Sequence, residues 1–465
     1  MKRKVLLVIP VYKNQNMSPA FIPPQIGLAS IAAVLLKNNY TVEIFDGEIN
    51  PSYDAFKKKI LDFQPELVGF TAYTKTVMAA SICAQIVKDI DKKIQTVIGG
   101  PHATMIPQQT LEEFSAFDLA VIREGENTII QILETNYEIA KIAQVAGISY
   151  RQNGQVITNP PVSYVDLDSL PFPAWDLFKL KTYNLNNYTW NYFKSRTHEL
   201  FITVTRGCPF ACTFCCRVLE TKVRKRAVSN IISEIKWLIE IYKVRSLSFS
   251  SDTFTYDENY VIEICQAMIA EGLHKKISWT CSTRIDCLNE KLLRIMKSAG
   301  CQVIMLGLET SNQENLNAIN KRYDNQMTSQ MVNLIRSIGI IPISSFILGL
   351  PFEDKKSISN TIKFASKLKL GFALFTIFTP FPGTKLAQEL QHNGRIKTFN
   401  WSKYDTQSSD YTIINDKLEQ RDLMWLHLKG YLKFYFNYRN FLKIFRTVKI
   451  KSVPLYLLKF ISYNR

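Results

Sequence analysis

The stretch LFITVTRGCPFACTFCC, residues 200–216, holds four of the nine cysteines in this chain of 465 residues. Its first half predicts a β-strand, and the strand runs directly into a turn with Cys208, Cys212 and Cys215 in the spacing C-x3-C-x2-C. Three thiolates on one tight turn are able to converge on a single metal centre. The turn is therefore the first candidate for a functional site.

The type of metal centre follows from the ligands that accompany the turn. A structural zinc ion takes four protein ligands, but there is no second cysteine pair and the closest histidines are His198 and His274. Cys216 directly follows Cys215, which makes it a poor fourth ligand to the same ion. An iron–sulfur cluster fits better, because three thiolate ligands leave one iron of a four-iron cluster open. Structural zinc and buried core thiols are the alternatives.

Strand and helix patterns alternate around the cysteine turn from residue 197 to 390. The six βα steps are too many for a small flavodoxin-like domain and predict a partial or full (β/α) TIM-like barrel. The chemistry of such barrels lies at the C-terminal ends of the strands, and the cysteine turn follows the first predicted strand.

Residues 1–142 carry another alternating series, which predicts an α/β domain with a doubly wound, Rossmann-like (flavodoxin-like) sheet. Ligands bind such sheets beyond the carboxyl ends of the strands. The turns Gly99-Gly100 and Gly125-Glu126 fall at these ends and are candidate binding elements. The apolar run at the N-terminus is only about seven residues long, so we expect a first strand there rather than a signal peptide.

Two regions complete the expected organisation. Residues 143–196 show no clear period apart from a hairpin around Asn153-Gly154, so we expect a linker. Residues 391–465 form a basic, aromatic-rich region that we expect to be helical.

The C-terminal region holds most of the excess positive charge. Between Arg421 and Arg465 there are ten Lys and Arg residues and one acid, Asp422, for a net charge of +9 out of +17. A basic surplus favours an anionic partner. The region is either an amphipathic helix that reaches a lipid substrate at a membrane surface or, as we favour, a helical layer on the barrel with a solvated face. No recognisable nucleic-acid module accompanies the charge, so nucleic acid is not the expected partner.

Composition and cysteine usage narrow the cellular setting. Hydrophobic residues make up 46% of the chain and charged residues 21%, which is ordinary for a soluble globular protein. No apolar stretch reaches the roughly 18 residues that span a bilayer. The odd number of cysteines is not spaced as a disulfide framework. We therefore expect a cytoplasmic protein with reduced thiols, with peripheral membrane contact through the tail as the alternative.

The cysteine turn resembles that of the radical S-adenosylmethionine superfamily, with an aromatic residue, Phe214, just before the last cysteine. The resemblance implies that Cys208, Cys212 and Cys215 bind a catalytic 4Fe-4S cluster. The open iron would chelate S-adenosylmethionine, and one-electron reduction would cleave it to a 5′-deoxyadenosyl radical. Such a reaction needs an electron donor, and we expect a flavodoxin- or ferredoxin-type reductant.

Five later strand ends, SFSSDTF, CSTRID, LGLETSN, FILGLPFED and FTPFPGT, resemble the superfamily's remaining cofactor contacts. The resemblance implies that they bind successive parts of S-adenosylmethionine. The residues concerned are Asp252 (amino group), Arg284 (carboxylate), Gly307 and Glu309 (ribose), Gly349 and Pro351 (adenine), and Pro380, Pro382 and Gly383 on the last strand.

The first domain and the linker segment DLDSLPFPAWDLF resemble the class of this superfamily that has a cobalamin-binding domain before the barrel. The carrying stretches include VIGGPHATMIPQQTLEEF and LAVIREGENTII. The D-x-H-x-x-G loop, whose histidine ligates cobalt in the best-known cobalamin domains, is absent, and TAYTKTVMAAS stands in its place. The resemblance implies cobalamin bound without a protein histidine, with His102 as a turn residue beside the site. The alternative is a Rossmann-like domain that has lost this ligand or binds substrate.

The function implied is a cobalamin-dependent radical enzyme that methylates an unactivated carbon of a small molecule, a lipid or a natural-product precursor. One alternative is a radical S-adenosylmethionine cyclase or rearrangement enzyme without bound cobalamin. Another is a non-catalytic iron–sulfur protein, which the matches at Asp252, Arg284 and Glu309 disfavour. The substrate and the oligomeric state are not implied by any of these motifs.

Overall fold

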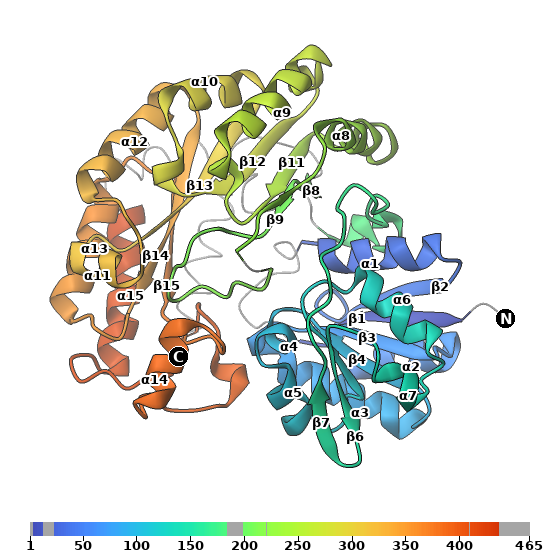
Figure 1. Ribbon diagram of the computed structural model, residues 1–465. Coiled ribbons are helices and arrows are strands. Elements are labelled where there is room, and N and C mark those ends of the chain that lie inside the picture. Colours follow the sequence, from blue (N-terminus) through green and yellow to red (C-terminus); the bar gives the residue numbers. More distant parts are fainter. Residues whose placement is uncertain (1–2, 13–22, 184–198, 220, 409, 437–465) are drawn as a thin grey trace.

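The computed structural model describes residues 3–12, 23–183, 199–219, 221–408 and 410–436. Two β-sheets, one in each half of the chain, lie side by side, and helices cover them (Figure 1). The predicted α/β class, with a Rossmann-like sheet followed by a barrel-like sheet, is confirmed.

The first sheet has seven strands in the order β2-β1-β3-β4-β5-β6-β7. The strands from β2 to β5 are parallel, in the doubly wound order of flavodoxin-like folds. The central strand β1 has the sequence KVLLVI, and its apolar run suits a strand that is covered on both faces. The strands are β1 (Lys4–Ile9), β2 (Thr41–Asp46), β3 (Leu67–Thr71), β4 (Gln95–Gly99), β5 (Leu119–Val121), β6 (Ile148–Gln152) and β7 (Gln155–Thr158).

Helices cover both faces of this sheet. Alternate residues of β1 enter two separate apolar cores, Leu7 on the face of α1 and α6 and Leu6 on the face of α2, α3 and α5, because side chains alternate along a strand. The helices are α1 (Ile26–Lys37), α2 (Tyr53–Phe63), α3 (Val77–Ile90), α4 (Pro101–Met105), α5 (Pro107–Glu113), α6 (Glu126–Glu134) and α7 (Ile139–Ile142).

Strands β6 and β7 form the expected hairpin. Its turn residues Asn153 and Gly154 both have positive φ, as the Asn-Gly pair favours. Strand β6 pairs antiparallel with β5, so the hairpin extends the first sheet. The sheet therefore continues past residue 142, and the segment that connects the two sheets begins only after β7.

The second sheet has six parallel strands in chain order, β8-β11-β12-β13-β14-β15. Within the described ranges its edge strands β8 and β15 do not pair with each other, so the barrel is partial and open. The strands are β8 (Glu199–Thr203), β11 (Ser246–Ser250), β12 (Ser278–Thr283), β13 (Cys301–Glu309), β14 (Ile341–Leu348) and β15 (Phe372–Ile377).

Helices line the outer side of this sheet, as Figure 1 shows for α8, α9, α10 and α12. A short antiparallel pair, β9 (Thr205–Arg206) and β10 (Arg224–Lys225), stands at the base of the cysteine loop. The helices are α8 (Val228–Tyr242), α9 (Glu258–Ala270), α10 (Glu290–Ser298), α11 (Gln313–Ala318), α12 (Asn325–Ser337), α13 (Lys355–Lys367) and α14 (Lys385–His392).

The described part of the C-terminal region is only partly helical, whereas the prediction made residues 391–465 helical. The described residues of 393–408 and 410–419 are irregular apart from the 3-10 turn η10 (Trp401–Lys403) and an isolated antiparallel β-bridge between Ile396 and Ile413. Helix α15 (Gln420–Tyr435) packs on α13 and β15. This contact agrees with the helical layer on the barrel that we favoured for the C-terminal region. The rest of the tail, residues 437–465, lies outside the described residues.

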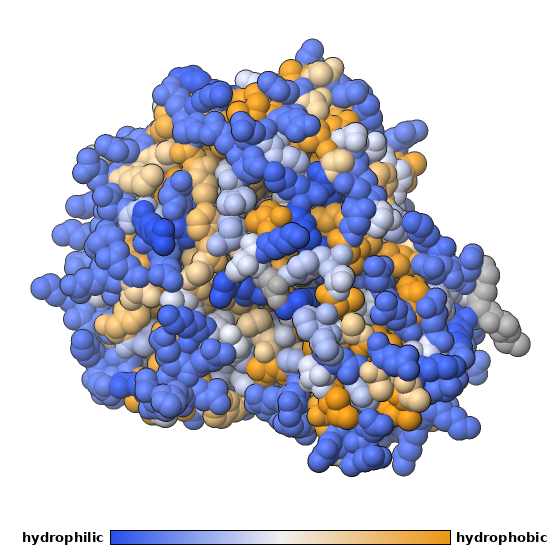
Figure 2. All heavy atoms as spheres, viewed as in Figure 1, coloured by the Kyte–Doolittle hydropathy of each residue, from blue (hydrophilic) through white to orange (hydrophobic). Residues whose placement is uncertain are grey.

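Helices long and apolar enough to cross a membrane are absent from the described part of the chain. Hydrophilic side chains cover most of the face shown in Figure 2, with apolar groups scattered between them.

Candidate functional site

The cysteine loop leaves the C-terminal end of β8 through β9. Gly207 has φ +98°, and a Cβ at this position would overlap the carbonyl oxygen of Lys222. Only glycine combines this conformation with this close approach. The backbone leading into Cys208 is therefore fixed by the sequence of the loop itself.

The thiols of the loop lie near one another and near the ends of two neighbouring strands. Cys208 Sγ is 3.5 Å from Thr253 Oγ1, which follows β11, and Cys212 Sγ accepts a 3.4 Å hydrogen bond from Arg284 Nη1, which follows β12. Solvent reaches Cys215, yet desolvation by surrounding atoms, followed by the proximity of Cys212 and other thiols, raises its pKa to about 12.

The three predicted ligands provide the donor type of an iron–sulfur cluster, and the partly buried Phe214 packs against the barrel core beside them. Among the residues that the structure describes, no three His, Cys, Asp or Glu side chains already form a metal-binding group. The thiols therefore fit a cluster by their chemistry and by their neighbourhood in the loop.

Asp252, the predicted partner of the amino group, lies directly after β11. Its carboxylate accepts a hydrogen bond from the backbone N–H of Gly207. Burial raises the pKa of Asp252, and its charge contributes to the raised pKa of Cys215. The structure thus brings this carboxylate to the cysteine loop.

Arg284, the predicted partner of the carboxylate, is buried at the end of β12. Its guanidinium donates to both oxygens of Asp286, at 2.9 and 2.7 Å, and lies 4.0 Å from the ring centre of Phe210 in the cysteine loop. Its Nη1 points at Cys212. The structure brings Arg284 to the loop, with Asp286 holding its orientation.

Glu309, predicted near the ribose, ends β13 with φ +59°, a left-handed conformation that is strained for a residue with a side chain. Its buried carboxylate pairs with Lys321 at 3.2 Å. Lys321 Nζ and Tyr323 Oη also donate to the carbonyl oxygen of Gly307, at 3.0 and 2.7 Å. Lys321, which the motifs did not single out, thus balances the charge at this strand end.

Gly349 and Pro351, predicted near the adenine, form the turn after β14. The fully buried Glu353 accepts hydrogen bonds from the N–H groups of Gly349 and Leu350, at 2.9 and 3.1 Å. Burial raises the pKa of Glu353 to about 7 despite these donors. Because Glu353 stands within the predicted segment FILGLPFED, its presence was visible in the sequence, although its capping role was not.

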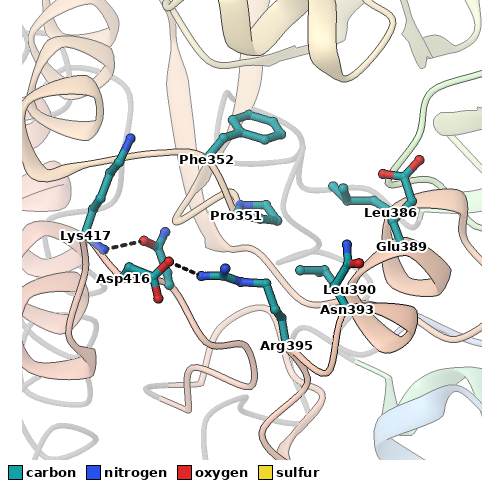
Figure 3. A pocket seen from close by; sticks show the side chains of 10 residues that line it. Pro351, Phe352, Leu386, Glu389, Leu390, Asn393, Arg395, Asp416 and Lys417 are labelled. Atoms are coloured by element: carbon teal, nitrogen blue, oxygen red, sulfur yellow. Dashed lines mark hydrogen bonds and ion pairs between the residues drawn. The ribbon is translucent and has the colours of Figure 1, made fainter.

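A pocket of about 310 Å³ opens beside this turn (Figure 3). Pro351 and Phe352 lie on one side and Leu386 of α14 on another, and an ion pair between Arg395 and Asp416 lies at its edge. The N–H of Leu386 donates to the carbonyl oxygen of Thr213, so the same helix wall contacts the cysteine loop. The pocket therefore adjoins both the predicted adenine turn and the predicted cluster site.

The last-strand motif contacts the first domain instead of a pocket interior. A Cβ on Gly383 would overlap the side chain of Met105 in α4. Pro380 and Pro382 precede this contact in the chain. The motif thus joins the end of the barrel to the first domain.

The predicted turns of the first domain lie at the carboxyl ends of β4 and β5. A Cβ on Gly100 would overlap the backbone of Ala72, and one on Gly125 would press against Ile31, so protein packing explains both glycines. Gly99 has no atom closer than 4.0 Å to such a Cβ. Of the three glycines, Gly99 therefore leaves the most room at its strand end.

Glu126, in the predicted turn after β5, forms an ion pair with a residue of the second half of the chain. It is buried and pairs with Arg206 Nη2 at 2.6 Å, which places a predicted cobalamin-domain residue against the base of the cysteine loop. The sequence motifs single out Glu126 but give no signal of this partner.

His102 is fully buried. Its Nδ1 is 3.3 Å from Thr74 Oγ1, its ring packs edge-on against Trp401, and its Nε2 has no hydrogen-bond partner. Burial lowers its pKa to about 4. Trp401, from the C-terminal region, was not predicted at this site, and no motif marks it.

Comparisons with known proteins agree with this division of the chain. Residues 16–133 match the B12 binding domain, and residues 202–365 match the Radical SAM superfamily. An uncharacterized methyltransferase of Pyrococcus horikoshii is 32% identical over 437 residues, which cover 93% of this chain and 92% of that protein. An anaerobic magnesium-protoporphyrin IX monomethyl ester cyclase of Rubrivivax gelatinosus is 28% identical over 93% of this chain and 78% of that protein.

Solved structures share the fold. The cobalamin-dependent S-adenosylmethionine radical enzyme OxsB, with aqua-cobalamin and S-adenosylmethionine bound, superposes with a TM-score of 0.74 and 15% identity, over 99% of this chain and 72% of that chain. The radical S-adenosylmethionine methyltransferase TsrM from Kitasatospora setae, with cobalamin and a 4Fe-4S cluster bound, gives 0.68 and 18%, over 84% and 75% of the two chains.

The two matched domains stand in the predicted order, and the identity to the Pyrococcus methyltransferase extends over nearly the full length of both proteins. The recognition made from the cysteine turn is confirmed, and this chain belongs to the cobalamin-dependent radical S-adenosylmethionine methyltransferase family.

Proposed function

We propose that this protein methylates an unactivated carbon of a small molecule, a lipid or a natural-product precursor. The observation that carries the proposal is the convergence of Asp252 and Arg284 on the cysteine loop, in a chain that also has a B12 binding domain. A sensor protein has no need for residues that grip both ends of an amino acid moiety, so this arrangement favours turnover.

The residues of the loop would hold the reactive cofactors. Cys208, Cys212 and Cys215 would bind three irons of a 4Fe-4S cluster, leaving the fourth open. Asp252 would bind the amino group of S-adenosylmethionine, and Arg284 its carboxylate, through a guanidinium that Asp286 already orients. When bound, the cluster and S-adenosylmethionine would supply a radical that removes a hydrogen atom from the substrate. Methylcobalamin would supply the methyl group for the resulting carbon radical.

Three further strand ends would complete the S-adenosylmethionine site. Gly307 and Glu309 would face the ribose, and Gly349 and Pro351 the adenine. The pocket beside Pro351 has the volume of a small-ligand site, and its polar rim, with Arg395 and Asp416, suits a hydrated entrance.

Cobalamin would lie at the carboxyl ends of the strands in the first sheet, where α/β sheets bind ligands. Gly99 leaves space there for close approach. Glu48, two residues after β2, has its pKa raised to about 7 by burial and by Asp46, and the nearby Lys75, four residues after β3, opposes this shift. These polar groups suit the amide-rich rim of a corrinoid.

A second candidate reaction is a cyclisation or rearrangement. The observation that favours it is the 28% identity to a magnesium-protoporphyrin IX monomethyl ester cyclase over 93% of this chain. Both reactions begin with removal of a hydrogen atom, so the residues of the cysteine loop would serve either one.

The proposed partners are a flavodoxin- or ferredoxin-type reductant and the substrate itself. A lipid substrate would make residues 437–465 a membrane contact at the cytoplasmic face. Removing only these residues is the informative deletion, because α15 carries buried core residues. A lipid role predicts that the deletion abolishes binding to anionic vesicles, while equal binding of the two forms would end that idea.

The first experiment is anaerobic purification with cobalamin supplied, followed by measurement of iron, sulfide and corrinoid per chain and of S-adenosylmethionine cleavage after reduction. We expect about four irons, one corrinoid and reductive cleavage. Four irons and cleavage without corrinoid would favour the cyclisation candidate. Zinc, or no metal, would overturn the proposed function.

A further inference from the structure

Four buried charged residues join the first domain to the base of the cysteine loop. Arg206 donates from Nη1 to Glu124 Oε1 at 2.7 Å and from Nη2 to Glu126 Oε1 at 2.6 Å. Arg224 donates from Nη2 and Nη1 to the two oxygens of Glu124, at 2.7 and 2.9 Å. The four side chains are between 2% and 12% exposed. We call these four residues the bridge.

The charges of the bridge balance. Burial by itself would raise the pKa of Glu124, but hydrogen bonds and charges from Arg224 and Arg206 hold it below its ordinary value. Two carboxylates and two guanidinium groups neutralise one another in this buried position, and Nε of Arg224 is left without a hydrogen-bond partner among the described residues. Forked pairs fix orientation as well as distance, because a guanidinium is planar.

The two ends of the bridge reach the two predicted cofactor sites. Glu124 and Glu126 flank Gly125 at the N-terminus of α6, on the binding edge of the first sheet. On the other side, only Gly207 separates Arg206 from Cys208, and that glycine is locked by the carbonyl of Lys222 and by its hydrogen bond to Asp252. Movement of Arg206 is therefore passed directly to the first cluster ligand.

The connecting segment is tied into the same bridge. The N–H of Val165 donates to Glu124 Oε2 at 3.2 Å, and Arg224 Nη1 donates to the carbonyl oxygen of Val165 at 3.0 Å. Val165, in the described part of the connecting segment, is thus held by two residues of the bridge.

We propose that Arg206 is a positioning residue, which through Glu124 and Glu126 fixes the separation and orientation of the corrinoid-binding edge and the cysteine loop. The inference rests on the proposed function. Group transfer between two cofactors depends on their mutual placement to within fractions of an ångström, and the bridge joins the two predicted sites through direct side-chain contacts.

The test variant is Arg206→Lys. It keeps one positive charge, but an ammonium group is a point donor and does not fork across two carboxylates. The matched control is Arg226→Lys. Arg226 is also buried and also pairs with a buried glutamate, Glu234, but both belong to the barrel. Arg226 donates to Glu234 through Nη1 and to Asn230 through Nη2. Both variants therefore replace a buried guanidinium that binds two side chains, and only Arg206→Lys does so at a contact that spans the domains.

The first measurement is the distance distribution between cob(II)alamin and the reduced cluster in the reconstituted protein, by pulsed dipolar electron paramagnetic resonance, which needs no substrate. We expect a narrow distribution in the natural protein and in Arg226→Lys, and a broader or shifted one in Arg206→Lys. An unchanged distribution in Arg206→Lys would overturn the inference, because a purely structural role would leave the spin separation intact.

The second measurement is amide hydrogen exchange without cofactors, over residues 199–208 and 119–126. Faster exchange in both segments in Arg206→Lys but not in Arg226→Lys supports the bridge, and equal exchange overturns it. If the natural protein holds no corrinoid or cluster, the proposed function fails, and this measurement still decides the positioning role. If Arg206→Lys does not fold, Glu126→Gln, which removes one arm of the bridge, takes its place in both measurements.

Discussion

Arg284 shows how a single residue acquires its setting from the fold. The motif CSTRID predicts it beside the cofactor, and the structure adds that Asp286, two residues later, grips its guanidinium. The 3-10 turn η9 (Ile285–Cys287) makes this local pairing, while Phe210 and Cys212 approach from a loop about 70 residues earlier in the chain. The residue type predicts the positive charge at this position, and the contacts in the folded protein decide where the guanidinium points.

The cysteines of the loop are expected to differ in iron binding. Replacing Cys208, Cys212 or Cys215 with Ala should each abolish the cluster, because two thiolates do not hold it. Cys216→Ala, beside them in the chain, should retain about four irons. Iron and sulfide analysis after anaerobic reconstitution measures this. Loss of iron in Cys216→Ala would mean that the ligand set was misassigned.

The buried His102 predicts a pH dependence of stability. Its folded pKa is about 4, below the ordinary value of 6.5, so the unfolded chain binds more protons between these values. The contribution of His102 to the free energy of unfolding should therefore fall by about 2 kcal/mol between pH 7 and pH 5. It is opposite in sign to the contributions of Glu48 and Glu353, whose pKa values burial raises to about 7.

Urea denaturation followed by circular dichroism at the two pH values measures this effect. His102→Phe, which keeps an aromatic ring against Trp401, should lose this component of the pH dependence. If the natural protein and the variant respond to pH equally, the buried neutral imidazole is not its source.

At the scale of elements, α15 closes the outer side of the open barrel. The Cβ that Gly349 lacks would overlap Leu423 of this helix, and Phe434 packs edge-on against Phe375 of β15. The predicted adenine turn is therefore held from behind by the C-terminal helix. The interleaved aromatic and basic pattern of α15 arises because one side meets the barrel and the other meets solvent.

This packing predicts opposite outcomes for two aromatic residues on α15. Phe434 is 1% exposed and Trp425 is 58% exposed. Phe434→Ala should lower the free energy of unfolding by about 3–5 kcal/mol, whereas Trp425→Ala should cost less than about 1 kcal/mol. Urea denaturation of both variants compares them. Equal, small effects would show that the helix does not contribute to the core.

At the scale of the whole molecule, the C-terminal region returns to the first domain. Trp401 and Tyr404 belong to the apolar core on the α2, α3 and α5 face of the first sheet. Trp401 Nε1 donates to Glu113 at 2.6 Å, and Asp405 pairs with Lys75 at 3.3 Å. We call Trp401, Tyr404 and Asp405 the clamp. The clamp joins the two domains, as the bridge also does.

Trp401→Ala should uncouple the two domains. It removes a buried ring and the hydrogen bond to Glu113, at a cost of about 3–5 kcal/mol. Differential scanning calorimetry should show the first domain unfolding at a lower temperature than the barrel, where the natural protein unfolds in a more cooperative transition.

The matched control for the clamp is Phe399→Ala. Phe399 contacts the same indole but is 49% exposed. Its replacement should leave the calorimetric profile nearly unchanged. A Trp401→Ala profile that matches the natural one would show that the clamp does not couple the domains.

The amino-acid sequence alone determined the local features of this protein. Apolar runs and helical periods follow from neighbouring residues, so both sheets, the Asn153-Gly154 hairpin and the order of the two domains were predictable. The spacing of Cys208, Cys212 and Cys215 on a single turn was predictable for the same reason, since it needs no contact with distant residues.

Only the tertiary structure decided the contacts between distant segments. The pairing of Glu126 with Arg206, the placement of Lys321 on Glu309 and the packing of Trp401 on His102 join residues from 12 to 299 positions apart. Local sequence patterns do not predict such pairs, because the residue type at one position does not determine which distant residue the folded chain brings into contact with it. The residue types of the site were thus predictable from the sequence, whereas the relative positions of those residues were set by the packing of the two domains.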